Sequence, residues 1–418
     1  ADLVGITAYT NNAPRAYEIS RLYRQRGTKT VIGGVHASMM CDEAARYVDS
    51  VVIGEAESVW PRLLSDFENN ELGRLYRGER VCLENLVWPR RDLYSSRYVV
   101  KAFVQTARGC PNDCEFCSVT ALNGRSYRQR PAEDVLDELE AIDSKNLFFT
   151  DDNFLGYGRS AEERAIQLFR GMIERGLDKR WVSQVGIDVA NNSDLLKYAR
   201  KAGCLGVFIG FESLSEETLR SMSKGRNLKV GTRNYKEVVK KIRAHGIAVV
   251  GAFVFGGDGD TKDVFPRTTE FILDSKIDAE QLTIMTPLPG TRLYGRLQQE
   301  ERLLRTDYPH DWEYYDFGEV VFRPRYLAPD ELKEGVLQVY KDTTGRTTSL
   351  RRALDTATQV KTLHGAAAAY LWNRGYGSAW KRKYEYMKNA DRFAPQQSSL
   401  VHPVADEQSP EEELVESH

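Results

Sequence analysis

The sequence lacks the features that would place the protein in a membrane, outside the cell or on nucleic acid. No apolar run approaches the roughly 20 residues of a membrane-spanning helix. Residues 1–10 carry no basic signal-peptide region and are typical of a strand. Charge almost cancels, with 58 Lys and Arg, 60 Asp and Glu and a net charge of −2, so the charge gives no reason to expect a nucleic-acid partner. These absences predict a cytoplasmic globular protein without a nucleic-acid partner.

Cysteine is also scarce, with six in 418 residues. Six scattered cysteines are too few for a disulfide framework in a chain of this length, which favours a reducing compartment. The chain also starts with alanine, directly in a strand. From this start we expect a fragment, or a sequence that begins part-way through a domain.

The length predicts two or three domains, because one ordinary core does not grow to this size. Residues 1–70 alternate three short strands with helices, which predicts a parallel sheet with right-handed crossovers. Three such strands make about half of a doubly wound, Rossmann-like domain. Residues 71–99 have weak periodicity and are expected to form a linker.

A longer alternation over residues 100–290 predicts an α/β domain with six βα units. Six units in this length favour a closed or partial (β/α)6 barrel resembling a TIM barrel, whose chemistry would lie at the carboxyl ends of the strands. The expected strands are 102–107, 146–152, 181–187, 206–212, 248–256 and 279–288.

Residues 291–395 read as a mostly helical extension, and the acidic residues 396–418 as a disordered tail. The basic stretch 351–392, with nine Lys and Arg against three Asp and Glu, fits either a peripheral membrane contact or a solvated helix face. An aromatic segment within the extension could line a substrate pocket or form core: Trp312, Tyr314, Tyr315 and Phe317.

Half of the cysteines stand in one stretch, "RGCPNDCEFC", as Cys110, Cys114 and Cys117. Thiolates bind soft metals, but a structural zinc site normally has four ligands and this stretch contains no fourth. A 4Fe–4S cluster held by three cysteines leaves one iron open to another ligand. The less favoured interpretations are a zinc knuckle that staples the loop, and three unligated thiols.

The sequence "CPNDCEFC" resembles the cluster-binding loop of the radical S-adenosylmethionine (SAM) enzymes, and the resemblance extends over roughly residues 100–290. It implies a partial barrel of six βα units in which SAM chelates the open iron. It also implies one-electron cleavage of SAM to a 5′-deoxyadenosyl radical that abstracts hydrogen from an unreactive carbon. An electron donor such as flavodoxin or ferredoxin would be required.

The same resemblance implies SAM contacts at the strand ends. Asp151 or Asp152 would meet the methionine amino group, or cap a helix instead. Ser183 and Gln184 would contact the carboxylate or ribose, unless they only follow strand alternation. Glu212 would contact the amino or ribose groups of SAM, or form a salt bridge inside the protein instead. Gly256 and Gly257 would let adenine lie against the sheet, or form a plain turn.

Residues 1–65, with the Gly33-Gly34 turn and the "GEAE" segment, are similar to the second half of a cobalamin-binding domain. His36 does not stand where a lower cobalamin ligand is expected and is predicted to be a loop histidine. The branch with such a domain includes hopanoid methylases, hopanoid side-chain enzymes and an anaerobic cyclase of bacteriochlorophyll synthesis.

This resemblance implies a cobalamin-dependent radical C-methyltransferase acting on a small-molecule or lipid-like substrate. The first alternative is a radical oxidative cyclase or rearrangement enzyme without methyl transfer. The second is a non-catalytic metal-binding protein. The residues do not identify the substrate.

Overall fold

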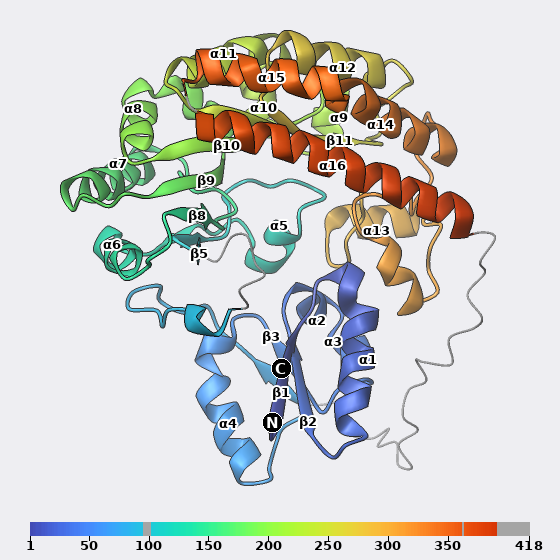
Figure 1. Ribbon diagram of the computed structural model, residues 1–418. Helices are drawn as coiled ribbons and strands as arrows, with labels where there is room; N and C mark the ends of the chain where they lie inside the picture. Colours follow the sequence, from blue (N-terminus) through green and yellow to red (C-terminus); the bar gives the residue numbers. More distant parts are fainter. Residues whose placement is uncertain (95–101, 362, 391–418) are drawn as a thin grey trace. The chain divides into compact units, whose positions relative to one another are not determined.

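The computed structural model describes residues 1–94, 102–361 and 363–390, with side chains up to residue 382 (Figure 1). The chain divides into two compact units. Unit 1 contains Ala1–Val81 and Asp307–Glu313, and unit 2 contains Cys82–Thr306 and the described part of Tyr314–Arg392. The expected acidic tail, 396–418, lies outside the described residues.

Unit 1 is a parallel sheet with the strand order β1-β2-β3-β4. The strands are β1 (Leu3–Thr7), β2 (Lys29–Gly33), β3 (Ser50–Ile53) and β4 (Leu75–Arg77). The last strand pairs with β3 and lies inside the segment expected to be a linker. The helices are α1 (Ala13–Arg24), α2 (Val35–Met39), α3 (Cys41–Ala44) and α4 (Trp60–Glu68), with short 3-10 helices at Thr10–Asn12 and Ala56–Ser58.

Unit 2 is built on a six-stranded parallel sheet with the order β12-β11-β10-β9-β8-β5, so β5 and β12 form its edges. All six strands expected from the sequence are present: β5 (Ala102–Val104), β8 (Asn146–Phe149), β9 (Arg180–Val185), β10 (Cys204–Glu212), β11 (Ala248–Phe255) and β12 (Ala279–Ile284). A small antiparallel pair, β6 (Ala107–Arg108) and β7 (Arg128–Gln129), stands beside it. The predicted α/β class is confirmed, as a partial barrel.

The helices of the βα units follow their strands in sequence. They are α5 (Ser118–Asn123), α6 (Ala132–Glu140), α7 (Arg159–Glu174), α8 (Ser193–Lys201), α9 (Glu216–Ser221), α10 (Gly225–Val230), α11 (Tyr235–Ala244), α12 (Val264–Asp274) and α13 (Arg292–Gln299). The 3-10 helices of the remaining chain are Arg91–Leu93, Ile187–Asn191, Thr232–Asn234 and His310–Tyr314.

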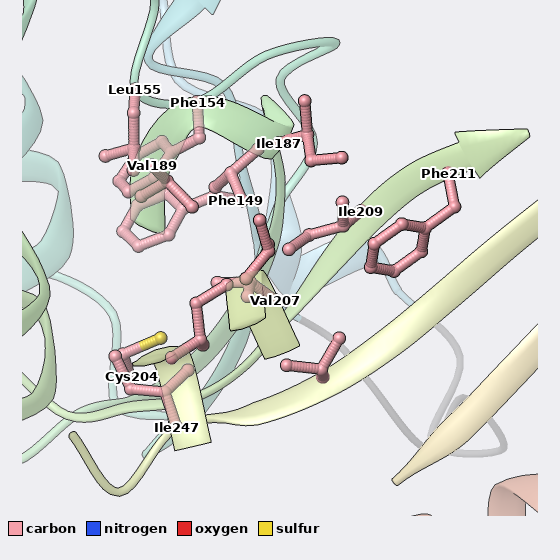
Figure 2. Packing of buried hydrophobic residues seen from close by; sticks show 14 of the residues in the cluster. Phe149, Phe154, Leu155, Ile187, Val189, Cys204, Val207, Ile209, Phe211 and Ile247 are labelled. Carbon is pink, nitrogen blue, oxygen red and sulfur yellow. The ribbon is translucent and has the colours of Figure 1, made fainter. Parts of the chain in front are cut away.

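One face of the large sheet carries the main hydrophobic core. Figure 2 shows part of it, including Phe149, Ile209, Phe211 and Cys204. Cys204 is completely buried among apolar side chains, and Cys82 is exposed. Both are free thiols outside the three-cysteine stretch, and Cys204 acts as a small core residue.

The helical extension predicted after the barrel is present as α14 (Pro329–Thr344), α15 (Arg346–Gln359) and α16 (Leu363–Ala390). Tyr340 on α14 both accepts from the amide of Leu282 at 2.9 Å and donates to its carbonyl at 2.8 Å, which ties α14 to β12. Trp372 on α16 donates to the carbonyl of Glu280 at 3.0 Å and packs edge-on against Phe208. Trp372 thus places this part of α16 against Phe208, on the face of the sheet opposite the main core.

The aromatic segment expected as pocket or core divides between the two units. Trp312 and Tyr315 are buried, as in a core, whereas Phe317 is 46% exposed and borders a cavity with Trp380 and Tyr376. None of the helices in the described part of the chain is long and apolar enough to cross a membrane.

Candidate functional site

The three cysteines lie on a loop between β6 and α5. Cys110 and Cys114 are buried, and Cys117 is half-buried and immediately precedes α5 as its N-cap residue. The loop starts at Gly109, whose φ of +86° is a left-handed conformation. A Cβ atom on Gly109 would lie 2.3 Å from the carbonyl oxygen of Ser126, so this entry to the loop requires glycine.

Residues between the cysteines clamp the loop to distant segments. Arg292 on α13 pairs with Asp113 at 2.7 Å, and Arg296 pairs with Glu115 at 2.7 Å. The amide of Glu115 also donates to the carbonyl of Met222, at 3.1 Å, after α9. The cysteine loop is therefore fixed by segments that come more than 100 residues later in the sequence.

Cys110 reaches a cavity of about 160 Å³ at the carboxyl ends of the strands. The wall also contains three residues predicted as SAM contacts, namely Asp152, Gln184 and Glu212. Further polar side chains line it: Asn112, Asn153, Tyr157, Lys224, Arg226, Asn227 and Gln281. This cavity is the candidate site.

The two adjacent aspartates predicted as alternatives are placed differently. Asp152 lines the cavity, and burial raises the pKa of its carboxyl. Asp151 is not part of the wall. Its carboxylate accepts from the backbone amides of Thr106, at 2.9 Å, and Ala107, and burial raises its pKa to about 7. Asp151 therefore organises the backbone that leads into the cysteine loop.

Strand alternation separates Ser183 from Gln184 in the same way. The Ser183 hydroxyl is buried and donates to the carbonyl of Phe149 at 3.1 Å, which joins β9 to β8. Gln184 is exposed to the cavity. Gln184 therefore lines the cavity and Ser183 does not, and the contact of either residue with SAM stays a prediction.

Gly256 and Gly257 do not line the cavity that contains Cys110. Their amides donate to Asp260 at 2.9 and 3.1 Å, and both border a separate, much smaller cavity beside Glu115 and Phe116. Their expected contact with adenine stays a prediction.

Glu212 forms an ion pair with Lys224 at 2.8 Å, and the two side chains are only 10% and 12% exposed. Burial by itself would lower the pKa of Lys224, but the nearby Glu212 carboxylate and Cys114 outweigh it and raise the pKa. Lys224 also lies 5.9 Å from the ring centre of Phe116, within the cysteine loop. A buried cation therefore lies near the thiols. Thiolate ligands would bring negative charge to this place, and the ammonium of Lys224 would offset part of it.

Several site residues have no obvious signal in the sequence. Asn153 is 2% exposed, and neither atom of its amide has a hydrogen-bond partner among the described residues. Such an orphaned buried amide in a cavity wall indicates a ligand. Tyr157 accepts from Asn112 at 3.0 Å, and the Arg226 guanidinium lies 3.8 Å over its ring. The only sequence signals for these residues are the segment "DNFLGYG", which follows the end of β8, and the segment "SKGRN", which follows α9.

In unit 1, the carboxyl ends of β1 and β2 meet at one edge of the sheet, where ligands of such sheets bind. Gly34 follows β2 with φ of +95°, and its missing Cβ would lie 2.7 Å from the hydroxyl of Thr7. Tyr9 follows β1 and is 65% exposed. The edge thus offers an exposed aromatic ring and a close backbone turn, which fit a large ring cofactor.

His36 differs from its expectation as a loop histidine. It lies in α2 and is completely buried. Its Nε2 lies 3.2 Å from the Tyr17 hydroxyl and 3.3 Å from Glu43. Trp312 donates to both carboxylate oxygens of Glu43, at 3.1 and 3.0 Å. Buried polar groups of this kind need partners, so His36 belongs to an internal network.

The comparisons with known proteins agree with this geometry. Residues 104–272 match the profile of the radical SAM superfamily, and residues 1–64 match that of the B12 binding domain. Over 353 residues the chain is 30% identical to a bacteriochlorophyllide d C-12(1)-methyltransferase of Chlorobaculum tepidum, covering 82% of this chain and 74% of that one. The chain belongs to the radical SAM superfamily.

Other relatives define the branch. An anaerobic magnesium-protoporphyrin IX monomethyl ester cyclase of Cereibacter sphaeroides is 26% identical over 380 residues, 81% of this chain and 59% of that one. The radical SAM methyltransferase TsrM of Kitasatospora setae, solved with cobalamin and a 4Fe–4S cluster, has the same fold. Its TM-score is 0.64 at 16% identity, with 90% of this chain and 88% of that one covered.

This radical SAM protein is therefore an enzyme, with a 4Fe–4S cluster, SAM and cobalamin as cofactors, as the sequence resemblance implied. The donor set fits the cluster, because three thiols on one loop are soft ligands for iron. No three His, Cys, Asp or Glu side chains of the described residues form a site for a single metal ion. The three cysteines do not have to point at a single ion, because each cysteine of a 4Fe–4S cluster binds a different iron.

Proposed function

We propose that this radical SAM protein is a cobalamin-dependent methyltransferase that methylates an unactivated carbon of an apolar, ring-containing small molecule. One observation carries the proposal: a three-cysteine loop faces a cavity of acids and amides in a chain that also has a B12-binding domain. The methylated or cyclised compounds named for its relatives are large ring systems. When bound, the cluster and SAM supply one-electron chemistry, and cobalamin supplies the methyl group.

The chain's own residues bind and orient these groups. Cys110, Cys114 and Cys117 hold the cluster. Asp152 and Glu212 line the cavity as acids, and acids accept hydrogen bonds from an ammonium group such as that of SAM.

Arg226 and the orphaned amide of Asn153 stand in the same wall. A guanidinium pairs with a carboxylate, so Arg226 suits the other end of the methionine moiety. The side-chain amide of Asn153 can both donate and accept a hydrogen bond, and its partner would be a polar atom of SAM. Burial around these groups excludes water from the reacting centre.

The test is a methyl-transfer assay with SAM labelled in its methyl group. The reconstituted enzyme is incubated without oxygen with a reductant and a bacteriochlorophyllide, the acceptor named for the relative. We expect labelled product and 5′-deoxyadenosine. Cys114→Ala should abolish both, and the matched variant Cys82→Ala, at an exposed thiol, should abolish neither.

The outcomes separate the alternatives. Release of 5′-deoxyadenosine with product that never carries the label would contradict methyl transfer and favour oxidative cyclisation or rearrangement. The same assay, run with flavodoxin or ferredoxin in place of a chemical reductant, tests the proposed electron donor.

A peripheral contact with anionic lipid forms a separate part of the proposal. Four exposed leucines support it, Leu350 and Leu354 on α15 and Leu363 and Leu371 on α16. Leu350 directly precedes the basic stretch 351–392, and the other three lie within it. Apolar side chains flanked by cations are typical of helices that lie on membrane surfaces. Sedimentation with anionic vesicles but not neutral ones is expected, and Leu350→Glu with Leu354→Glu should abolish it.

A further inference from the structure

The sheet of unit 2 has an aromatic face that the proposed chemistry does not use. Strand alternation turns Phe149 and Phe211 into the main core and turns Phe148 and Phe208 to the opposite side. Phe148 and Phe208 are half-buried, and Phe103 on the edge strand β5 is 41% exposed. These rings are therefore only partly covered by protein.

The rings form a continuous row. The ring centres of Phe103 and Phe148 are 6.3 Å apart, and those of Phe148 and Phe208 are 5.9 Å apart. Trp372 of α16 continues the row 5.3 Å from Phe208, and Tyr376 stacks on Trp372 at 5.2 Å. We call these five residues the aromatic floor.

The aromatic floor joins the candidate site through one residue. Phe208 also lines the cavity that contains Cys110. The in-register neighbours in the sheet are uncharged, with Val182 beside Phe148, and Gln184 and Val250 beside Phe208. A substrate on this surface would meet aromatic and aliphatic groups on one side and the polar cavity at one end.

We propose that the aromatic floor binds a planar conjugated macrocycle of the tetrapyrrole class, as the methyl acceptor; this rests on the proposed function. Three interstrand steps separate β5 from β10, or roughly 14 Å at the usual strand spacing. This width exceeds a single aromatic ring and suits a macrocycle. Several rings in edge and tilted contact favour a conjugated ligand over a saturated polycycle, because aromatic pairs contribute more than buried area alone.

The test measures binding separately from catalysis. Protoporphyrin IX is titrated into the full-length holoenzyme without oxygen, and binding is followed by porphyrin fluorescence anisotropy. Phe148→Leu and Phe208→Leu keep an apolar side chain but remove the ring. Each should weaken binding roughly twofold to tenfold, the range for loss of one aromatic pair. Tyr198→Ala, on the outer helix α8, is the matched control and should bind normally.

The result that overturns the inference is equal binding by Phe148→Leu, Phe208→Leu and the unchanged enzyme. Displacement of the porphyrin by a saturated pentacyclic triterpene at equal concentration would also overturn it, in favour of a hopanoid-type ligand. Release of 5′-deoxyadenosine without acceptor is measured on every variant. If it persists while porphyrin binding is absent, only this inference fails; if porphyrin binds but no label is transferred, only the proposed function fails.

Discussion

The buried ion pair between Lys224 and Glu212 gives the sharpest prediction. The pair is 2.8 Å long, and each side chain is about nine-tenths buried. Lys224→Met keeps most of the apolar stem and removes the ammonium. Glu212 is then left as an uncompensated buried charge. Breaking one partner of a buried pair costs about 3 to 5 kcal/mol, and since Met fills the space we expect a loss near the lower end, about 3 kcal/mol.

A double-mutant cycle isolates the electrostatic part. Glu212→Gln together with Lys224→Met removes both charges and should recover about 2 kcal/mol relative to Lys224→Met alone, because no unpaired charge remains. The measurement is urea unfolding of the apo protein followed by circular dichroism. The exposed pair Arg159–Glu163 is the matched control, and Arg159→Met should leave the urea midpoint nearly unchanged, because solvent screens an exposed pair.

Two results would refute this reasoning. One is a loss below about 1 kcal/mol for Lys224→Met, the value of a solvated pair. The other is a double variant that is no more stable than the single one.

Three further predictions concern the cysteine loop and its supports. Burial raises the folded-state pKa of Asp151 from 3.8 to about 7, so between these values the folded protein holds a proton that the unfolded chain has lost. Stability should therefore fall as pH rises from about 4 to about 7. Asp151→Asn keeps the acceptor oxygen and should make the urea midpoint less dependent on pH over this range, and an unchanged slope would contradict the assignment. Gly109→Ala should lower iron content after reconstitution, because it adds a clash to the strain of a positive φ. Gly158→Ala, with φ of +85° and ψ of 167° but nothing within 4 Å, should cost only the backbone strain of about 1 to 3 kcal/mol. Arg296→Ala should speed cluster loss in air by loosening the clamp on the loop, and equal rates in Arg296→Ala and Arg159→Ala would argue against the clamp.

Much of the barrel could be predicted because buried parallel strands leave apolar runs bounded by turns. The run 206–212 corresponds to β10, observed as Cys204–Glu212, and the run 279–288 to β12, observed as Ala279–Ile284. The cysteine loop was predictable for a local reason as well, since its ligands lie within eight residues. Features of this kind can be predicted because the residues that form them are close together in the sequence.

The rest of the site depends on contacts that a linear pattern does not contain. Lys224 comes 107 residues after Cys117 and reaches the cysteine loop only through the turn after α9. Asp151 and Asp152 are adjacent and of one residue type, and the backbone of the segment after β8 decides that Asp152 lines the cavity while Asp151 binds the amides of Thr106 and Ala107. Trp312 follows the barrel in sequence, yet its indole completes the His36 network of unit 1, which no periodicity indicates.

A single strand, β10, explains how the site separates its apolar and polar functions. Every second residue from Phe208 to Glu212 borders the same cavity, namely Phe208, Gly210 and Glu212. Phe208 supplies the aromatic end. Gly210 leaves space, because a Cβ atom there would lie 2.2 Å from the carboxylate of Glu212. The register with β11 shifts between Gly210 and Glu212, and Glu212 takes φ of +62°.

That strained position has a consequence for the chemistry. A non-glycine residue with positive φ costs about 1 to 2 kcal/mol, and the ion pair with Lys224 holds Glu212 there. The register shift between Gly210 and Glu212 thus places the carboxylate of Glu212 in the same cavity wall as Cys110. Phe208, earlier on the same strand, keeps its contacts with Phe148 and Trp372. The proposed one-electron chemistry would therefore lie at the polar end and the proposed acceptor at the aromatic end, because the five residues from Phe208 to Glu212 change the environment from aromatic to charged.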